Sequence, residues 1–316
     1  MSEQPSQAKP ANNLLGAVWM LGSAFGFTLF LLLSKLLSET HNPGYLAFWR
    51  TAIALAVIAP YVLTKGRHHL RVYQPGRIVL RSLLGTIGFV CSMFAVSEAM
   101  GLPLSQFNAI SFSRALFVTV LAALILRESV GIHRWGAVAF GFLGVLIMVV
   151  PETIFFWLPE VDPADQHPNA WLGTLLAIAS AFFLAMAIIL VKTLTALHSP
   201  MTLLLWASIL STILLAPFLF LTPSQPSLED WGLITLMALA GTGAQFCYIN
   251  AMSVGDASFL SPMDYLRLPM AALADWLAFK MFPGPFVWLG ASVIIISTLY
   301  ITVRERLTSR SKDPAQ

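Results

Sequence analysis

Two arginines lie deep inside apolar stretches of this sequence, where a charge is costly to bury. Arg114 falls ten residues into the stretch 104–126, and Arg267 falls ten residues into the stretch 257–281. At a helical rise of about 1.5 Å per residue, each guanidinium lies about 15 Å from the helix end, near the middle of a bilayer. A charged side chain there costs about 3 kcal/mol or more, so it faces a partner, a water-filled cavity or a ligand. Because guanidinium groups match carboxylates and phosphates, the pair predicts a site for an anionic or zwitterionic small molecule.

The alternative interpretation is that a carboxylate of the protein neutralises each arginine and that the pair only fixes packing. Asp264 lies three residues before Arg267, within reach on a helix. Both interpretations stay open at the level of the sequence. A third arginine, Arg50, lies about 10 Å into the stretch 44–64. It either faces the same cavity or extends toward the helix end.

Other polar and aromatic side chains inside the apolar stretches are further candidates for substrate contact. They are Tyr265, Ser111, Asn108, Trp49, Tyr248 and Asn250. The competing interpretation is structural, because hydroxyl and amide groups in membrane helices commonly bond a helix backbone. For Trp49 the competing role is packing.

Three carboxylates are candidates for proton coupling, because burial favours the protonated form of a carboxyl group. They are Asp264, Asp275 and Glu98. Asp264 and Asp275 are eleven residues apart, almost three turns, so a regular helix places them on one face. The alternatives are a salt bridge from Asp264 to Arg267 and structural roles for Asp275 and Glu98.

The amino-acid composition indicates whether these charges lie in a soluble protein or in a membrane protein. Of the 316 residues, 57% are hydrophobic and only 10% are charged, whereas a soluble domain has about 25% charged residues. Such a chain cannot cover itself with polar surface, so the sequence predicts an all-α integral membrane protein in a lipid bilayer. The net charge of +3 says little by itself, because the informative quantity in a membrane protein is where lysine and arginine fall along the chain, so no nucleic-acid partner is expected.

Ten stretches are long and apolar enough to cross a bilayer as helices. They are 14–36, 44–64, 77–99, 104–126, 132–151, 171–193, 200–221, 231–253, 257–281 and 286–303. Lysines and arginines concentrate in the second and fourth gaps and in the C-terminal tail, which predicts that both termini are cytoplasmic in a cell inner membrane. Lys35 and Lys280 fall on the opposite side, at helix ends where a lysine can extend to the membrane surface.

The chain also repeats itself. A shift of 157 carries Lys35 onto Lys192 and His41 onto His198, and a shift of 153 carries Arg114 onto Arg267. Each repeat holds five stretches, and an odd number makes the second repeat enter the membrane from the opposite side. The predicted organisation is a cytoplasmic tail, a first five-helix repeat, an acidic periplasmic loop, a second five-helix repeat of inverted topology and a basic cytoplasmic tail. Their bounds are 1–13, 14–151, 152–170, 171–303 and 304–316.

Several short motifs resemble the drug/metabolite transporter superfamily, in particular its ten-helix proteins with two EamA domains. The matching segments are Phe48-Trp49-Arg50, Leu124-Ile125-Leu126-Arg127-Glu128, the glycines Gly136, Gly141 and Gly144, Asp264-Tyr265-Leu266-Arg267, and Tyr300 to Glu305. The resemblance covers about residues 14–306 and implies ten helices and transport of a metabolite. One departure is Lys280-Met281, where the family often has Gly-Glu.

Together these features predict a secondary transporter or exchanger of a small organic metabolite, working by alternating access around a midplane site. The sequence holds no ATP-binding motif, so a proton or a counter-substrate is the expected driving partner. No catalytic residue, metal ligand or cofactor is expected, and the oligomeric state is not predicted. The rival hypotheses are an integral-membrane enzyme and a membrane scaffold that transports nothing.

Overall fold

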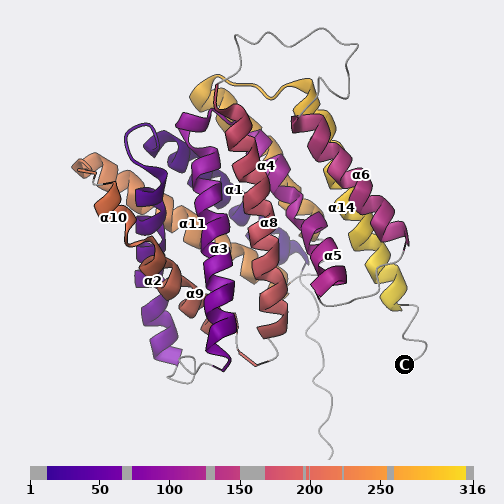
Figure 1. Ribbon diagram of the computed structural model, residues 1–316, viewed down its shortest axis with the longest axis horizontal. Helices are drawn as coiled ribbons and strands as arrows, with labels where there is room; N and C mark the ends of the chain where they lie inside the picture. Colours follow the sequence, from indigo (N-terminus) through magenta and orange to yellow (C-terminus); the bar gives the residue numbers. More distant parts are fainter. Residues whose placement is uncertain are drawn as a thin grey trace, which may run out of the picture.

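The protein is a bundle of helices, most of which run in one general direction (Figure 1). The computed structural model describes residues 13–65, 73–125, 132–149, 168–194, 197–198, 200–222, 224–254 and 260–310. These residues hold helices only, without a strand. The α-helices are α1 (Asn13–Leu37), α2 (Pro43–Lys65), α3 (Pro75–Val96), α4 (Leu104–Phe112), α5 (Arg114–Ile125), α6 (Ile132–Val149), α8 (Ala170–Leu194), α9 (Pro200–Leu215), α10 (Phe218–Leu221), α11 (Leu228–Val254), α13 (Arg267–Ala274) and α14 (Pro285–Arg310). Two 3₁₀ helices, η2 (Glu98–Met100) and η4 (Ser261–Leu266), and a π-helix, η5 (Asp275–Phe279), complete the described helices.

Proline begins four of the long helices. Pro43, Pro75, Pro200 and Pro285 are the first residues of α2, α3, α9 and α14. The first residues of a helix have no partner for their backbone N–H, so a residue without an N–H is tolerated there. The prolines that separate apolar stretches in the sequence therefore also start the helices that follow.

Among the described residues, seven helical segments are long and apolar enough to cross a membrane. They are Leu14–Leu37, Pro43–Pro60, Pro75–Val96, Leu104–Ile125, Ala170–Leu194, Thr202–Leu221 and Leu228–Val254. Two shorter apolar helices are Trp135–Ile147 and Pro285–Ser297. Large apolar side chains also face outward, among them Phe25, Leu124 and Ile213. An apolar exterior on an all-helical chain is the arrangement of a membrane protein, whose exposed faces contact lipid.

Two of the expected helices are interrupted in the structure. The stretch 104–126 ends its first helix at Phe112 and resumes at Arg114. Near this break, side chains compete for backbone carbonyls: Ser111 Oγ donates to the Asn108 oxygen, and Asn108 Nδ2 donates to the Leu104 oxygen.

The stretch 257–281 is also irregular where it is described, because it passes from 3₁₀ helix through α-helix to π-helix. Pro269 contributes to this irregularity, since it has no N–H to donate to the carbonyl of Tyr265 four residues earlier. The prediction that a regular helix places Asp264 and Asp275 on one face is therefore wrong. Instead, α5 begins at Arg114 and α13 begins at Arg267, so both arginines follow directly after a break.

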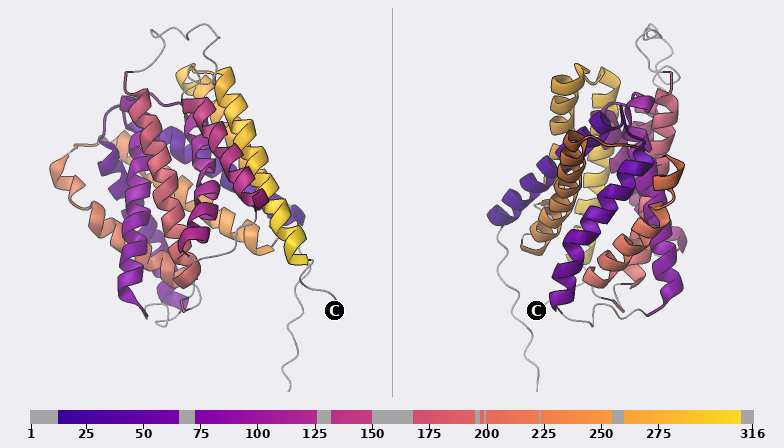
Figure 2. Two further views of the ribbon diagram at one scale, coloured as in Figure 1. Left: turned by 45° about the vertical axis from the view of Figure 1, so that its right-hand side comes forward. Right: turned by 90° about the vertical axis from the view of Figure 1, so that its left-hand side faces the viewer.

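The helices pack in extensive pairs, with α1 against α11, α3 against α8 and α6 against α14. Two views show α6 and α14 side by side at one edge of the bundle (Figure 2). Glycines allow the closest approaches. A side chain at Gly26 of α1 would meet Ala244 Cβ of α11 at 2.9 Å, and one at Gly88 of α3 would meet Leu184 of α8 at 2.9 Å. Small residues at helix interfaces drive association in a bilayer through close packing.

Several predicted features lie outside the described residues. They include residues 1–12 of the N-terminal tail, the Arg127-Glu128 motif, residues 152–167 of the acidic loop and residues 311–316 of the C-terminal tail.

We expect Gly26→Val to destabilise the protein by about 1–3 kcal/mol, the usual effect of overpacking a close helix contact. The added side chain would press on Ala244 and on the Ala240 carbonyl of α11. Thermal melting in detergent would measure the change. Gly243→Val is the matched control on α11, because a side chain at Gly243 has open space around it. Equal melting temperatures for the two variants would contradict the proposed contact.

Candidate functional site

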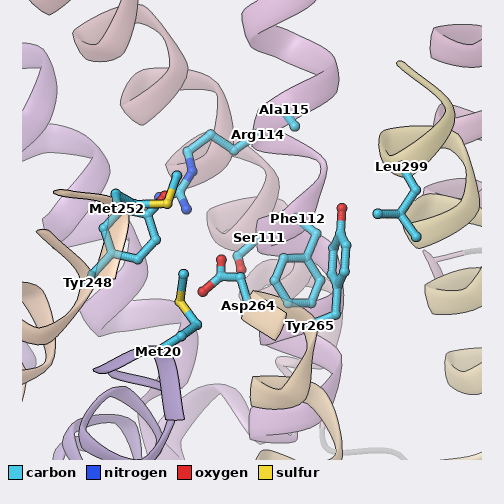
Figure 3. A pocket seen from close by; sticks show the side chains of 10 residues that line it. All are labelled: Met20, Ser111, Phe112, Arg114, Ala115, Tyr248, Met252, Asp264, Tyr265 and Leu299. Atoms are coloured by element: carbon cyan, nitrogen blue, oxygen red, sulfur yellow. The ribbon is translucent and has the colours of Figure 1, made fainter. Parts of the chain in front are cut away.

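A cavity of about 180 Å³ lies between α1, α4, α5, α11, η4 and α14. Its lining residues are Met20, Ser111, Phe112, Arg114, Ala115, Tyr248, Met252, Asp264, Tyr265 and Leu299 (Figure 3). The two helix breaks supply six of these ten residues. Where a membrane helix is interrupted, side chains and backbone groups can face a cavity inside the bundle. Interrupted helices of this kind commonly form binding sites in transporters.

Asp264 and Arg267 form an ion pair at this cavity. Arg267 Nη2 lies 2.7 Å from Asp264 Oδ1, and the two side chains are only 12% and 22% exposed. The Arg267 guanidinium also lies 4.1 Å from the ring centre of Phe27 and 6.0 Å from that of Tyr248. The ion pair that the sequence left as an alternative is therefore present, and Asp264 offsets the charge of Arg267.

Arg114 differs from Arg267, because no hydrogen bond or ion pair holds it within the described ranges. It lines the cavity and lies close enough to Arg267 and Tyr248 to interact with both electrostatically. Figure 3 shows its guanidinium directed toward Met252 and Tyr248, while Asp264 approaches from beside Ser111. With two arginines and one carboxylate, this cavity carries an excess of one positive charge among the charged groups that line or adjoin it.

Aromatic and sulfur-containing side chains form much of the remaining wall. Phe112 and Tyr265 meet edge to face with ring centres 4.8 Å apart, and Met20 and Met252 line the cavity with Tyr248. Aromatic and methionine side chains pack well against flat rings. The cavity wall therefore combines aromatic and sulfur-containing side chains with charged groups.

Sequence reasoning missed five of the lining residues, which are Met20, Phe112, Ala115, Met252 and Leu299. They are apolar residues in apolar stretches, so nothing in their type distinguishes them from lipid-facing neighbours. Phe112 and Ala115 flank the helix break before Arg114, and an expectation of that break is the one signal that could have found them.

The structure places four candidates outside the cavity. Asn108 donates to the Leu104 carbonyl of its own helix, and Asn250 donates in the same way to Phe246. Trp49 packs edge to face against Trp231, with ring centres 4.6 Å apart. Arg50 lies over the rings of Phe30 and Phe89.

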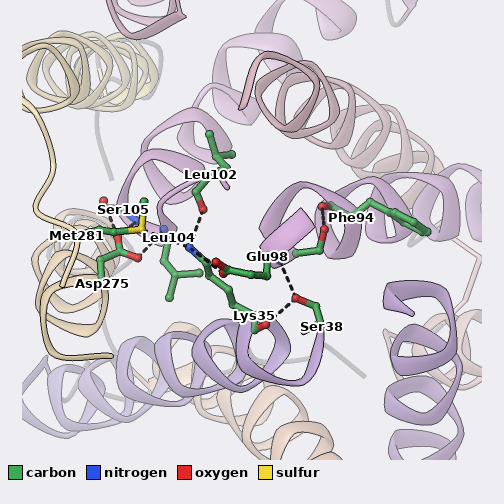
Figure 4. A network of polar contacts seen from close by, with 10 residues as sticks. Lys35, Ser38, Phe94, Glu98, Leu102, Leu104, Ser105, Asp275 and Met281 are labelled. Carbon is green, nitrogen blue, oxygen red and sulfur yellow. Dashed lines mark hydrogen bonds and ion pairs between the residues drawn. The ribbon is translucent and has the colours of Figure 1, made fainter. Parts of the chain in front are cut away.

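Asp275 lies at a different place, buried against the beginning of α4 (Figure 4). Its carboxylate accepts hydrogen bonds from the backbone N–H of Leu104 at 2.9 Å and from the backbone N–H and hydroxyl of Ser105, both at 2.8 Å. The carboxylate thereby accepts from backbone N–H groups that have no partner within the first turn of α4. Its negative charge also suits the N-terminal end of a helix. Asp275 thus joins η5 to α4.

Lys35 of α1 is fully buried beside this contact, so the expectation that it extends to the membrane surface is wrong. Its Nζ donates to the Leu102 carbonyl at 3.3 Å, lies 3.8 Å from a Glu98 carboxylate oxygen and lies 4.3 Å from the Phe279 ring centre. Glu98 remains 43% exposed. Figure 4 shows that these side chains converge from α1, η2, α4 and η5. Polar contacts near the C-terminal end of α1 therefore link segments that are far apart in the sequence.

Comparison with known proteins finds relatives that match almost the whole chain. The chain is 34% identical to a riboflavin transporter of Vibrio cholerae serotype O1, over 94% of this chain and 96% of that protein. It is 28% identical to an S-adenosylmethionine uptake transporter of Rickettsia prowazekii, over 96% of this chain and 97% of that protein. A crystal structure that is 17% identical covers 91% of this chain and 98% of its own, with a TM-score of 0.57, and supports the fold.

The family match covers both halves of the chain. The EamA-like transporter family matches residues 14–150 and again residues 171–303. The resemblance to the drug/metabolite transporter superfamily with two EamA segments is thereby confirmed. The chain belongs to the EamA-like transporter family.

Proposed function

We propose that this protein is a secondary transporter of a small metabolite with a flat heteroaromatic ring, and that a flavin is its cargo. The carrying observation is Arg114, which has no ion pair among the described residues, at a cavity whose walls include Tyr248, Tyr265 and two methionines. The relative from Vibrio cholerae is a riboflavin transporter. The isoalloxazine ring of riboflavin is flat and has carbonyl acceptors at one edge, which match a guanidinium donor.

A second candidate cargo is S-adenosylmethionine, which the Rickettsia prowazekii relative takes up. Its carboxylate would suit Arg114, and its adenine ring would suit the aromatic wall. Its sulfonium and ammonium groups, however, would enter a cavity with an excess of one positive charge. Like charges in a site of low dielectric repel strongly, so the flavin is favoured.

For the mechanism we propose two five-helix repeats of inverted topology, 14–151 and 171–303, that rock about a shared site in a ten-helix protein of the cell inner membrane. Matched contacts support this proposal. The pair of α1 with α11 has its counterpart in α8 with α3, and the contact of α11 with α2 has its counterpart in α3 with α9. The helix breaks before Arg114 and Arg267 are also at equivalent positions. Both termini would lie in the cytoplasm.

The contact between Asp275 and α4 would close one end of the route. The cavity lies beside Met20 of α1, and Lys35 lies fifteen residues further along the same helix, a rise of about 22 Å. Movement of cargo past that end requires η5 to separate from α4. A proton gradient or an exchanged solute would drive the cycle. Of the three carboxylates, Asp275 is the best placed for coupling, because Asp264 is already ion-paired, and Glu98 is 43% exposed and lies 3.8 Å from Lys35.

The rival hypotheses have less support. An enzyme needs a nucleophile, a base or a metal site at one depth, and the polar groups of the cavity are a carboxylate already paired to an arginine, a second arginine, a serine and two tyrosines. A scaffold without transport needs a dry interface, whereas this cavity has charged walls.

Purified protein in liposomes should take up labelled riboflavin, and Arg114→Gln should lower the initial rate by about tenfold or more. Loss of one hydrogen bond from a charged donor is worth about 1.5–3 kcal/mol, and 1.4 kcal/mol corresponds to tenfold. Arg77→Gln, which removes an exposed arginine of α3 away from the cavity, is the control and should transport normally. Normal uptake by a folded Arg114→Gln protein would contradict the assignment, and uptake of S-adenosylmethionine alone would favour the second cargo.

Asp275→Asn should weaken the closed end, because an amide keeps one acceptor oxygen and presents an N–H₂ group toward backbone donors. The test uses protein with Cys91 and Cys247 replaced and a new cysteine at position 111. A membrane-impermeant maleimide added on the side of η5 should label that cysteine several times faster in Asp275→Asn.

The comparison variant for this test is Ser105→Ala, which removes one hydrogen bond and keeps the two backbone donors. Its labelling rate should rise less than that of Asp275→Asn. Unchanged labelling in Asp275→Asn would show that this contact does not close the route.

A further inference from the structure

Arg50 is a second arginine near the cavity for which the described part of the chain provides no carboxylate partner. It projects from α2, and its guanidinium lies 5.5 Å from the ring centre of Phe30 on α1 and 4.8 Å from that of Phe89 on α3. Its Nε is buried and has no hydrogen-bond partner. Within the described ranges, no hydrogen bond or ion pair to Arg50 is present. Its favourable electrostatic contacts among the described residues are therefore the two cation–π contacts.

The rings do not offset the cost of this charge. A cation over an aromatic face gains about 0.5–2 kcal/mol, whereas a charged side chain in the interior of a membrane protein costs about 3 kcal/mol or more. A structural arginine would be expected to have a carboxylate or carbonyl partner, as Arg267 has in Asp264. Arg50 has neither, so its retention at this position calls for a ligand.

Arg50 also lies along the same seam as the cavity. Phe27 and Phe30, which lie under Arg267 and Arg50, are three residues apart on α1, a rise of about 4.5 Å. On α11, Tyr248 lies near Arg267, and Gly241 lies two turns away. Arg50 packs next to this part of α11, since a Cβ built at Gly241 would lie 3.5 Å from the Arg50 Nε. Both guanidiniums therefore lie between α1 and α11, offset along the helix axes by about one to two turns.

Three guanidiniums and one carboxylate occupy this seam, which leaves two positive charges without a counter-charge. We infer that Arg50 is a second binding position for the cargo, and that it takes an anionic group, a carboxylate or a phosphate ester, while the ring occupies the cavity beside Arg114. This inference rests on the proposed function and names the cargo class more closely. Riboflavin 5′-phosphate has this form, because its phosphate lies on a chain several bonds from the ring.

Thermal stability without ligand gives the first test. Arg50→Met keeps an unbranched side chain that reaches as far as the Arg50 Nε, but it removes the guanidinium and its charge. We expect its Tm to equal or exceed that of the wild type, because a binding residue that burial disfavours is replaced by an apolar one. Arg267→Met is the matched control and should lower the Tm clearly, since it leaves Asp264 buried without its partner. A fall in Tm for Arg50→Met equal to that for Arg267→Met would overturn the inference and assign Arg50 a structural role.

Binding gives the second test, with riboflavin, riboflavin 5′-phosphate and a flavin whose tail ends in a carboxylate as the probes. Wild-type protein should bind at least one anionic flavin about tenfold or more tightly than riboflavin. The preferred anion then identifies the group that Arg50 takes. Arg50→Met should lose that preference while it still binds riboflavin, and Arg50→Lys should keep part of it.

The outcomes separate the two proposals. Equal affinities of the wild type for charged and uncharged flavins, or an unchanged preference in Arg50→Met, would overturn the inference and leave flavin transport standing. If the wild type binds none of the three probes, the proposed flavin cargo is wrong. In that case the Tm comparison of Arg50→Met with Arg267→Met still decides whether Arg50 has a structural role.

Discussion

The cost of placing a charge in an apolar interior governs this structure. Two buried charges of the described residues have specific partners. Asp264 offsets Arg267 in an ion pair of 2.7 Å, and the beginning of α4 supplies three donors to Asp275. Because breaking a buried pair costs about 3–5 kcal/mol, these contacts hold their segments in place. Among the described residues, Arg114 and Arg50 are the arginines of the seam without such compensation, and they are the positions that we propose for the cargo.

The residues around the two helix breaks form much of the cavity wall. In a continuous helix the backbone groups bond to one another, and only the side chains of one face point into the bundle. Here α4 ends two residues before Arg114, and η4 ends directly before Arg267. The residues around both breaks then line a shared space that includes Ser111, Phe112, Asp264 and Tyr265. The same chain segments that could not remain regular helices thus provide most of the polar wall of the site.

Several expectations from the sequence were correct because they depended on residue type and local spacing. The membrane class follows from too few charged residues to cover a soluble surface, and the family follows from motifs spread over both halves of the chain. The pairing of Asp264 with Arg267 depended on a separation of three residues, which holds in a 3₁₀ turn as well as in an α-helix. The expected face shared by Asp264 and Asp275 was wrong because it required eleven residues of uninterrupted α-helix. Lys35 was expected at the membrane surface, but η2 and η5 bury it.

By itself, the sequence determined the solvent of this protein, its helical class, its family and the arginines that a bilayer makes costly. These properties depend on composition, apolar length and repeated motifs, which are local or additive along the chain. Only the tertiary structure decided which arginine Asp264 neutralises, since Asp264 reaches Arg267, while Arg114 lines the cavity with no ion pair in the part of the chain that the structure describes. It also decided that Asp275 meets the beginning of α4, 170 residues away in the chain, and that Met20, Met252 and Leu299 line the site. Contacts between distant segments depend on how the helices pack, and no spacing in the sequence specifies that packing.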